Sequence, residues 1–331
     1  MQRCRFEIEV RAPFRLDLTV WTLRRRPHNA VDRWGGASYR RTVTAGGQAV
    51  EIVVRQERSG QRPLLLVELR TTGRESPGRF EPEVRRLLDR TLGLSVDLGG
   101  FYTLAAHDER LTTLAEQFVG MRPPLFPTVF EAAVNAVACQ QLSLVVGVHL
   151  LNRLAQQVGP IIDRRDAVPG FPGPERLAEA DPQLLRDLGF SWNKAHAVTT
   201  LARQVASGKI DLESLRDADN ERAYATLVDL TGIGRWSTEY ILLRGLGRWQ
   251  ILPGDDVGAR NNLHKRFGLA SSAGYEEVTE LSRTWWPYGG LVYFHLLLDA
   301  LATAGHITPT MDPTNTSSGR RLACFPAERV P

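Results

Sequence analysis

The first hundred residues alternate apolar and polar positions with a period of two, which is typical of half-buried β-strands. Four runs carry this pattern or a continuous apolar stretch: 6–10, 14–20, 49–54 and 64–69. After Pro82 the valine and leucine positions recur at helical spacing instead. The pattern therefore predicts an α+β domain over residues 1–111, in which an antiparallel sheet is accompanied by a helix.

From about residue 112 the apolar period lengthens to that of an α-helix and stays so to about residue 304. Short segments rich in proline and glycine interrupt it, as expected where helices end. We therefore predict an all-α domain over residues 112–305. The remaining residues 306–331 are rich in Thr, Pro, Ser and Arg, so we expect a poorly ordered tail.

The composition fits two globular domains, because 331 residues exceed the usual size of one domain and 43% are hydrophobic. A net charge of +4 is too small to identify a nucleic-acid partner. Three scattered cysteines exclude a disulfide framework, a four-thiolate zinc site and an iron–sulfur cluster. The first ten residues lack the apolar core of a signal peptide, and polar residues interrupt the uncharged stretch 132–152. We expect a cytoplasmic protein without a membrane span.

Residues 221–247 read as an amphipathic helix, a TGIG turn and a second helix. Gly232 and Gly234 flank Ile233 and allow a tight turn, so backbone N–H groups at the start of the second helix point outward. No strand precedes the turn, which argues against a dinucleotide or P-loop fold. We predict that residues 232–234 and Arg235 hold a nucleic-acid phosphate, although a plain glycine-capped hairpin explains the spacing equally well.

The segment LPGDD follows, in which Asp255 or Asp256 starts another helix. Aspartate is a favoured N-cap residue, and capping alone accounts for its presence. The same position keeps a carboxylate ionised, which suits a group that meets a developing positive charge. The two roles are compatible.

The run LTGIGRWSTEYILLRGLG followed by LPGDD resembles the hairpin and catalytic aspartate of the helix-hairpin-helix DNA glycosylases, most closely bacterial 3-methyladenine DNA glycosylase II. The segments FPTVFEAAVNAVACQQLS and PERLAEADPQLLRDLGFSWNKAHAV resemble the helices that precede the hairpin in that family. The resemblance extends over the chain up to the tail. It implies a sheet domain followed by an all-α helix-hairpin-helix glycosylase domain.

This resemblance assigns the catalytic carboxylate to Asp256, with Asp255 as the runner-up. Bifunctional members of the family carry a Schiff-base lysine where this chain has Trp236, so the resemblance implies a monofunctional enzyme. It also implies a base pocket, with simple core packing as the alternative for each aromatic residue. The pocket residues are Trp236, Tyr240 and Tyr288, with Trp192 and Trp286 as weaker candidates.

The resemblance further places the residue that fills the gap left by a flipped base within VACQQLS. Gln141 is the first choice and Leu142 the second, with Gln140 beside them; amides that satisfy a helix end are the alternative. The family also implies a monovalent cation at backbone carbonyls of Leu230, Thr231 and Ile233. We expect no other cofactor, and the histidines show no metal-ligand spacing.

Residues 24–41 hold six arginines against one aspartate. They could follow a phosphate backbone, but a solvated face is the favoured interpretation. The resemblance implies a monofunctional glycosylase that removes alkylated purines from double-stranded DNA and leaves an abasic site, and we expect it to be a monomer. Two alternatives remain open: the same fold directed at deaminated or oxidised bases, and a non-catalytic protein that binds damaged DNA.

Overall fold

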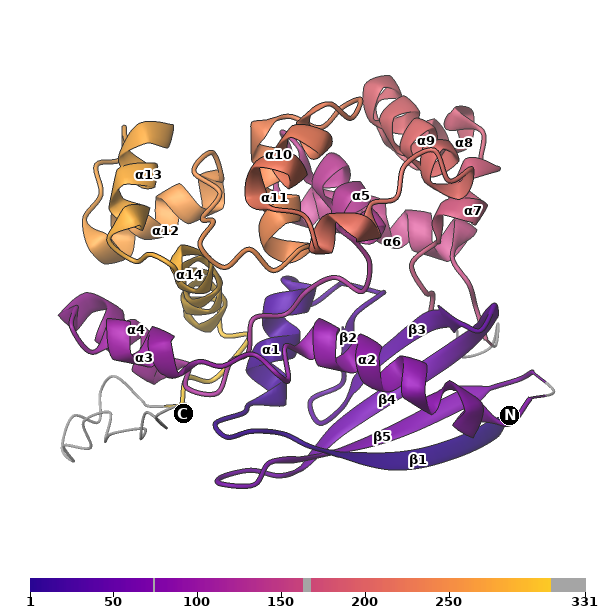
Figure 1. Cartoon of the computed structure of the whole chain (residues 1–331), viewed down its shortest axis with the longest axis horizontal. Coiled ribbons are helices and arrows are strands. Elements are labelled where there is room, and N and C mark those ends of the chain that lie inside the picture. The colour runs from indigo at the N-terminus through magenta and orange to yellow at the C-terminus, as the bar shows by residue number, and fades with distance from the viewer. Residues whose placement is uncertain (74, 163–167, 311–331) are drawn as a thin grey trace.

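The computed structural model describes residues 1–73, 75–162 and 168–310. A five-stranded antiparallel sheet lies on one side of the molecule, and helices form the rest (Figure 1). The strand order in the sheet is β1-β5-β4-β3-β2. The strands are β1 (Gln2–Glu9), β2 (Arg33–Trp34), β3 (Tyr39–Ala45), β4 (Gln48–Arg58) and β5 (Leu64–Thr71).

The helices comprise α1 in the first part of the chain, α2 on the sheet, and α3 to α14 beyond it. Those up to α7 are α1 (Leu16–Arg24), α2 (Glu81–Leu92), α3 (Gly99–Ala105), α4 (Glu109–Gln117), α5 (Val129–Cys139), α6 (Leu144–Val158) and α7 (Pro174–Ala178). The others are α8 (Pro182–Asp187), α9 (Trp192–Ala206), α10 (Asn220–Val228), α11 (Arg235–Arg244), α12 (Val257–Phe267), α13 (Tyr275–Arg283) and α14 (Gly289–Thr303). Two short 3₁₀ turns lie at Pro77–Phe80 and Glu213–Arg216.

The α+β fold class is confirmed, and the strands predicted over 6–10, 49–54 and 64–69 form as β1, β4 and β5. Helix α2 packs Val84 and Leu88 into the same core as Ile52 and Leu65 of the sheet. Because alternate side chains of a strand point to opposite faces, this helix covers the face that the apolar pattern marks. The predicted helix after Pro82 is therefore confirmed as well.

The strand predicted over residues 14–20 is wrong, because this segment is the helix α1. Eight of its nine residues are buried. A helix that is enclosed on nearly all sides has no polar stripe, so its sequence carries no period of 3.6. The apolar residues at alternate positions therefore imitate a strand.

The predicted boundary at residue 111 falls inside α4. Helices α3 and α4 share a core with the C-terminal helices, as buried Leu114, Trp285 and Phe294 show. Figure 1 shows α3 and α4 beneath α12 to α14, apart from the sheet. Helices α3 and α4 and the C-terminal helices therefore form a lobe of their own, to which α1 contributes Leu18.

Part of the predicted tail is packed against this lobe. The backbone N–H of Thr310 donates to the carbonyl of Gln117 at 2.7 Å, and the ring of His306 stacks on Trp21. Residues 311–331 lie outside the described residues. Within the described ranges, no helix is long and apolar enough to cross a membrane.

Candidate active site

The hairpin between α10 and α11 contains two glycines. The backbone conformation and packing require glycine at position 232 but not at position 234. Gly232 has φ +81°, and a Cβ there would lie 2.6 Å from the Cβ of Ala197 on α9. Gly234 has φ −101°, and a Cβ there would meet nothing within 4 Å. The fold of the free protein therefore explains Gly232, whereas Gly234 leaves open space in front of the backbone.

The start of α11 is an uncapped helix N-terminus at the surface. Gly234 is its N-cap and provides no side-chain hydrogen bond, while buried Ile233 anchors the turn in the core. The first N–H groups of a helix have no partner within it, and the helix dipole adds positive charge there. This arrangement suits an anion such as a phosphate.

Asp256 is the N-cap of α12, and its two carboxylate oxygens have different partners. Oδ1 accepts a hydrogen bond from the backbone N–H of Ala259 at 2.8 Å. Oδ2 accepts from the indole N–H of Trp236 at 3.2 Å and from the hydroxyl of Tyr293 at 3.3 Å. One oxygen therefore fixes the helix start, while the other lies among aromatic donors.

Asp255 differs from its neighbour because it is paired with two cations. Its carboxylate lies 2.7 Å from Arg235 and 3.2 Å from Arg260. Asp256 makes no ion pair with any residue in the described part of the chain. Its negative charge is thus the one that remains available to a ligand.

The side chain of Arg235, a predicted DNA contact, is half exposed and is paired within the protein. Its guanidinium is bonded to Asp255 and lies over the ring of Tyr275, 3.9 Å from the centroid. The hydroxyl of Tyr275 donates to the buried carboxylate of Glu239 at 2.6 Å, and burial raises the pKa of Glu239. Glu239 also accepts from the N–H of Gly254, so this group holds the loop that carries Asp256.

Trp236 and Tyr240 lie together beside Asp256, as their spacing predicts. Their rings stack with centroids 5.3 Å apart, and Tyr240 is buried beneath half-buried Trp236. Burial raises the pKa of Tyr240, whose oxygen accepts a hydrogen bond from Arg25 at 2.7 Å. The two aromatic residues thus form one wall next to the carboxylate.

The structure does not bring Tyr288 into this group. Its ring packs edge-on against Phe101, and its hydroxyl lies against Gly100 of α3. Among the described residues, the two weaker candidates also make no contact with this group. Trp286 is 69% exposed, and Trp192 is exposed and stacks on His196. Tyr288, which the resemblance assigns to the pocket, thus contacts α3, and its pocket role stays a prediction.

Sequence reasoning missed Tyr293, which α14 places against Asp256. Burial raises its pKa well above the usual value, and the Asp256 carboxylate adds to this effect. The hydroxyl therefore stays protonated and donates. A tyrosine within the apolar run GLVYFHLLL needs a partner for its hydroxyl when buried, and that signal was present in the sequence.

The loop between α5 and α6, residues 140–143, is called the plug loop below. Gln141 and Leu142 are exposed, and Gln141 has φ +53°, which is uncommon for a residue other than glycine. Gln140 differs, because its amide donates inward to the carbonyl of Gly232 and to Ser237 Oγ, both at 2.7 Å. Two of the three predicted contact residues thus point outward, and the third is engaged within the protein.

The predicted monovalent cation would bind at backbone oxygens of the hairpin turn, residues 229–234. The carbonyl of Leu230 already accepts from the N–H of Ile233 at 3.0 Å, and neutral carbonyl oxygens suit a hard cation. The site at Leu230, Thr231 and Ile233 stays a prediction. Among the described residues, no group of three or more His, Cys, Asp or Glu could hold a metal ion.

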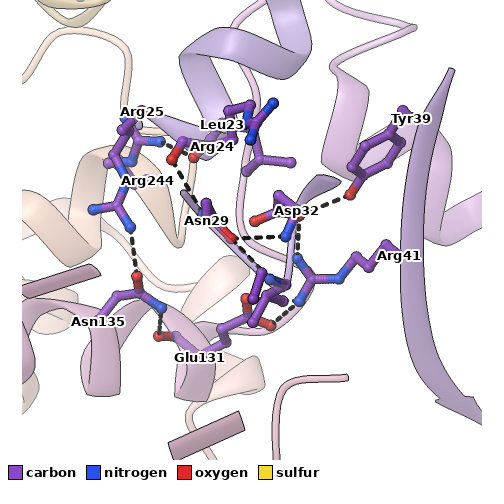
Figure 2. Close-up of polar contacts among 12 residues, drawn as sticks. Leu23, Arg24, Arg25, Asn29, Asp32, Tyr39, Arg41, Glu131, Asn135 and Arg244 are labelled. Atoms are coloured by element: carbon purple, nitrogen blue, oxygen red, sulfur yellow. Dashed lines mark hydrogen bonds and ion pairs between the residues drawn. The ribbon is translucent and has the colours of Figure 1, made fainter. Parts of the chain in front are cut away.

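Three of the six arginines in the arginine-rich segment, residues 24–41, turn inward instead of facing DNA or solvent. Arg41 of β3 forms ion pairs with Asp32 and with Glu131 of α5, each at 2.5 Å, and Arg25 donates to Asn135 at 2.7 Å (Figure 2). These five residues, all buried, are called the buried seam. Both interpretations of the segment are therefore wrong for Arg24, Arg25 and Arg41, which are buried.

Comparison with known proteins identifies relatives of this chain. Residues 134–288 match the model of the HhH-GPD superfamily of base excision DNA repair proteins. DNA-3-methyladenine glycosylase 2 of Escherichia coli is 32% identical over 181 residues, which cover 54% of this chain and 60% of that protein. DNA-3-methyladenine glycosylase of Bacillus subtilis is 29% identical over 65% of this chain and 71% of its own length.

A solved structure agrees over most of the chain. The 3-methyladenine DNA glycosylase from Archaeoglobus fulgidus superposes with a TM-score of 0.76 at 27% identity, and the match covers 88% of this chain and 97% of that one. The likeness therefore includes the sheet region as well as the hairpin domain.

Proposed function

We propose that this chain belongs to the HhH-GPD superfamily of base excision DNA repair proteins and that it is a monofunctional DNA glycosylase that removes alkylated purines from duplex DNA. The observation that carries the proposal is the position of Asp256. Among the described residues, its carboxylate has no cationic partner and lies between aromatic donors, and helix α11, which carries Trp236, begins with uncapped backbone N–H groups. A charge-stabilising group thus lies beside a phosphate-binding one.

Hydrolysis of an N-glycosidic bond gives the deoxyribose oxocarbenium character, and a nearby carboxylate stabilises that charge. We assign this role to Asp256 Oδ2, which can also orient the attacking water. The hydrogen bonds from Trp236 and Tyr293 fix the direction of this oxygen. The base must leave the stack first, which costs a few kcal/mol and less for a damaged base.

The absence of a lysine at the site favours a monofunctional reaction. Trp236 stands where a Schiff-base lysine would be expected. The chain has three lysines, of which Lys209 and Lys265 are exposed and Lys194 donates to the carbonyl groups of Ala138 and Gln140. The product would therefore be an abasic site in an intact strand.

The pocket wall favours an electron-poor base. An N-alkylated purine carries positive charge, and a cation is attracted to the face of a tryptophan ring. Half-buried Trp236 offers such a face next to Asp256. The names of the relatives, which are 3-methyladenine glycosylases, agree with this substrate class.

The test is product analysis on methylated duplex DNA. We expect the protein to release free 3-methyladenine and 7-methylguanine, and strand breaks to appear only after alkali. Breaks without alkali would contradict the monofunctional assignment. Release of deaminated or oxidised bases alone would assign the enzyme to a different substrate class. Tight binding to the lesion without release of any base would identify a damage-binding protein.

A further inference from the structure

The plug loop and the hairpin turn are joined by one side chain. Both amide protons of Gln140 are used, one on the carbonyl of Gly232 and one on Ser237 Oγ of α11. Gln140 is 92 residues before Gly232 in the sequence, so this contact exists only in the folded protein. The residue that follows is Gln141, in its left-handed conformation.

A lysine from a third element fixes the other side of Gln140. Lys194 of α9 donates to the backbone carbonyl of Gln140 at 2.6 Å and to that of Ala138 at 3.1 Å. These carbonyls belong to the C-terminal end of α5, where a helix carries partial negative charge and an ammonium group is favourable. Lys194 is partly buried, and this burial lowers its pKa.

The same helix α9 also meets the hairpin turn. The close approach of Ala197 to Gly232 leaves no room for a side chain at that glycine. Helix α9 therefore contacts the turn through Ala197 and the plug loop through Lys194. The phosphate-binding turn and the exposed tip at Gln141 are thus held by one helix and bridged by Gln140.

We propose that Lys194 and Gln140 are positioning residues, which hold Gln141 at a fixed distance and orientation from the hairpin turn. The proposal rests on the function proposed above, in which the turn binds a phosphate and Gln141 fills the gap left by the flipped base. A rigid connection lets both enter the duplex together. A loop free to move would have to be ordered during binding, which opposes the insertion step.

The experiment compares Lys194→Met and Gln140→Glu with the wild-type protein. Methionine keeps the length of the lysine side chain but donates no hydrogen bond, and glutamate keeps the shape of glutamine but cannot donate to the carbonyl of Gly232. Lys194→Arg should restore the contacts, because arginine donates several hydrogen bonds. Lys209→Met removes an exposed lysine and serves as the matched control.

The first readout is hydrogen–deuterium exchange of the plug-loop amides in the free protein, which needs no activity. We expect exchange about tenfold faster in Lys194→Met and Gln140→Glu, and unchanged rates in Lys194→Arg and Lys209→Met. Unchanged plug-loop exchange in both test variants would overturn the proposal, whatever the enzyme does. Equal acceleration throughout the protein would indicate general destabilisation and would also overturn it.

The second readout is base flipping, followed by the fluorescence of 2-aminopurine placed next to an alkylated base. We expect about tenfold slower flipping in the two test variants, with affinity for undamaged duplex changed by less than about twofold in Lys194→Met. Equal loss in both quantities would contradict a positioning role. If the wild-type protein neither flips the alkylated base nor binds duplex DNA, the proposed function is contradicted. The hydrogen–deuterium exchange rates would still decide whether Lys194 and Gln140 hold the plug loop.

Discussion

The buried seam and the surface around the hairpin use polar residues in opposite ways. In the seam, Arg41 meets two carboxylates and Arg25 meets an amide, all shielded from water. The surface around the hairpin, here called the hairpin face, comprises the hairpin turn, the plug loop and residues 255–257. There the first N–H groups of α11 are uncapped, Gln141 is exposed with a positive φ, and Asp256 forms an ion pair with none of the residues that the structure describes.

The difference shows that the density of charge along a sequence is a poor guide to a binding surface. The segment with most arginines forms interior contacts between the sheet, α1 and α5, whereas the proposed DNA-binding surface depends mainly on backbone groups and one carboxylate. A buried ion pair is not strong evidence of stability, but breaking it by removing one partner is costly. The two regions should therefore respond to mutation in different ways.

The largest expected effect is on stability, in Arg41→Leu. This change leaves the carboxylates of Asp32 and Glu131 buried without their cation, and we expect the free energy of unfolding to fall by about 3–5 kcal/mol. Urea unfolding measures it. Arg283→Leu, which breaks an exposed pair with Glu280, is the control and should cost less than about 1 kcal/mol. A similar loss of unfolding free energy in both variants would contradict the idea that the buried seam and the exposed surface respond differently to the loss of an ion pair.

A second test concerns a buried group that lacks such a partner. Burial lowers the pKa of His295 to about 4, from an ordinary value of 6.5. Below pH 6.5 the unfolded chain therefore binds a proton that the folded chain does not, and stability falls as the pH drops toward 4. The shift corresponds to about 3 kcal/mol over this window.

His295→Gln should flatten this part of the stability–pH curve, because glutamine does not titrate. Unfolding free energies at pH 7 and pH 4.5 for both proteins give the comparison. An unchanged difference between the two pH values would show that His295 is not the titrating group. It would also weaken the view that the interior accepts charge only where a partner is present.

The apolar pattern of the sequence predicted most of the sheet correctly. It did not predict a helix that is buried on nearly all sides, or the polar contacts in the interior. The strands β1, β4 and β5 follow from alternating or continuous apolar runs, but α1 is buried on nearly all sides and its helical period is hidden. The partner of Arg41 on α5 is Glu131, 90 residues away, so no local pattern could reveal that pairing. Burial of the arginine-rich segment was unpredictable for the same reason.

In the candidate site, residues close in sequence were found and distant ones were not. Trp236, Tyr240 and Asp256 lie on or just after one hairpin, and the structure brings them together. Tyr293 comes from α14, 37 residues after Asp256. The family resemblance gives Tyr288 as a pocket residue and does not include Tyr293. The inward role of Gln140 depends on the folded position of Gly232 and could not be read from the sequence.

A smaller effect is expected at Gly232, within the hairpin face. Alanine there must adopt φ +81° and would collide with Ala197, so we expect Gly232→Ala to lower the free energy of unfolding by about 1–3 kcal/mol. Thermal or urea unfolding measures the change. Wild-type stability would mean that the turn relaxes away from α9, and the rigid hairpin would have to be abandoned.

The smallest effect on stability is expected at Gly234, where a methyl group meets nothing in the free protein. Gly234→Ala should stay within about 0.5 kcal/mol of wild type. Affinity for a duplex containing an abasic-site analogue should nevertheless fall by about fivefold to tenfold, because the methyl group would stand between the helix N-terminus and the phosphate. Unchanged affinity would contradict the assigned phosphate contact.

The central claim, that Asp256 performs the chemistry while Asp255 is held in ion pairs, is tested most directly by single-turnover base release from methylated duplex DNA. Asparagine is also a good N-cap, so Asp256→Asn should keep the fold and the duplex affinity while release slows by at least about a hundredfold. Asp255→Asn should retain release within about fivefold of wild type, since only its pairs with Arg235 and Arg260 are weakened. Release at the wild-type rate by Asp256→Asn, or an equal loss in both variants, would contradict the account.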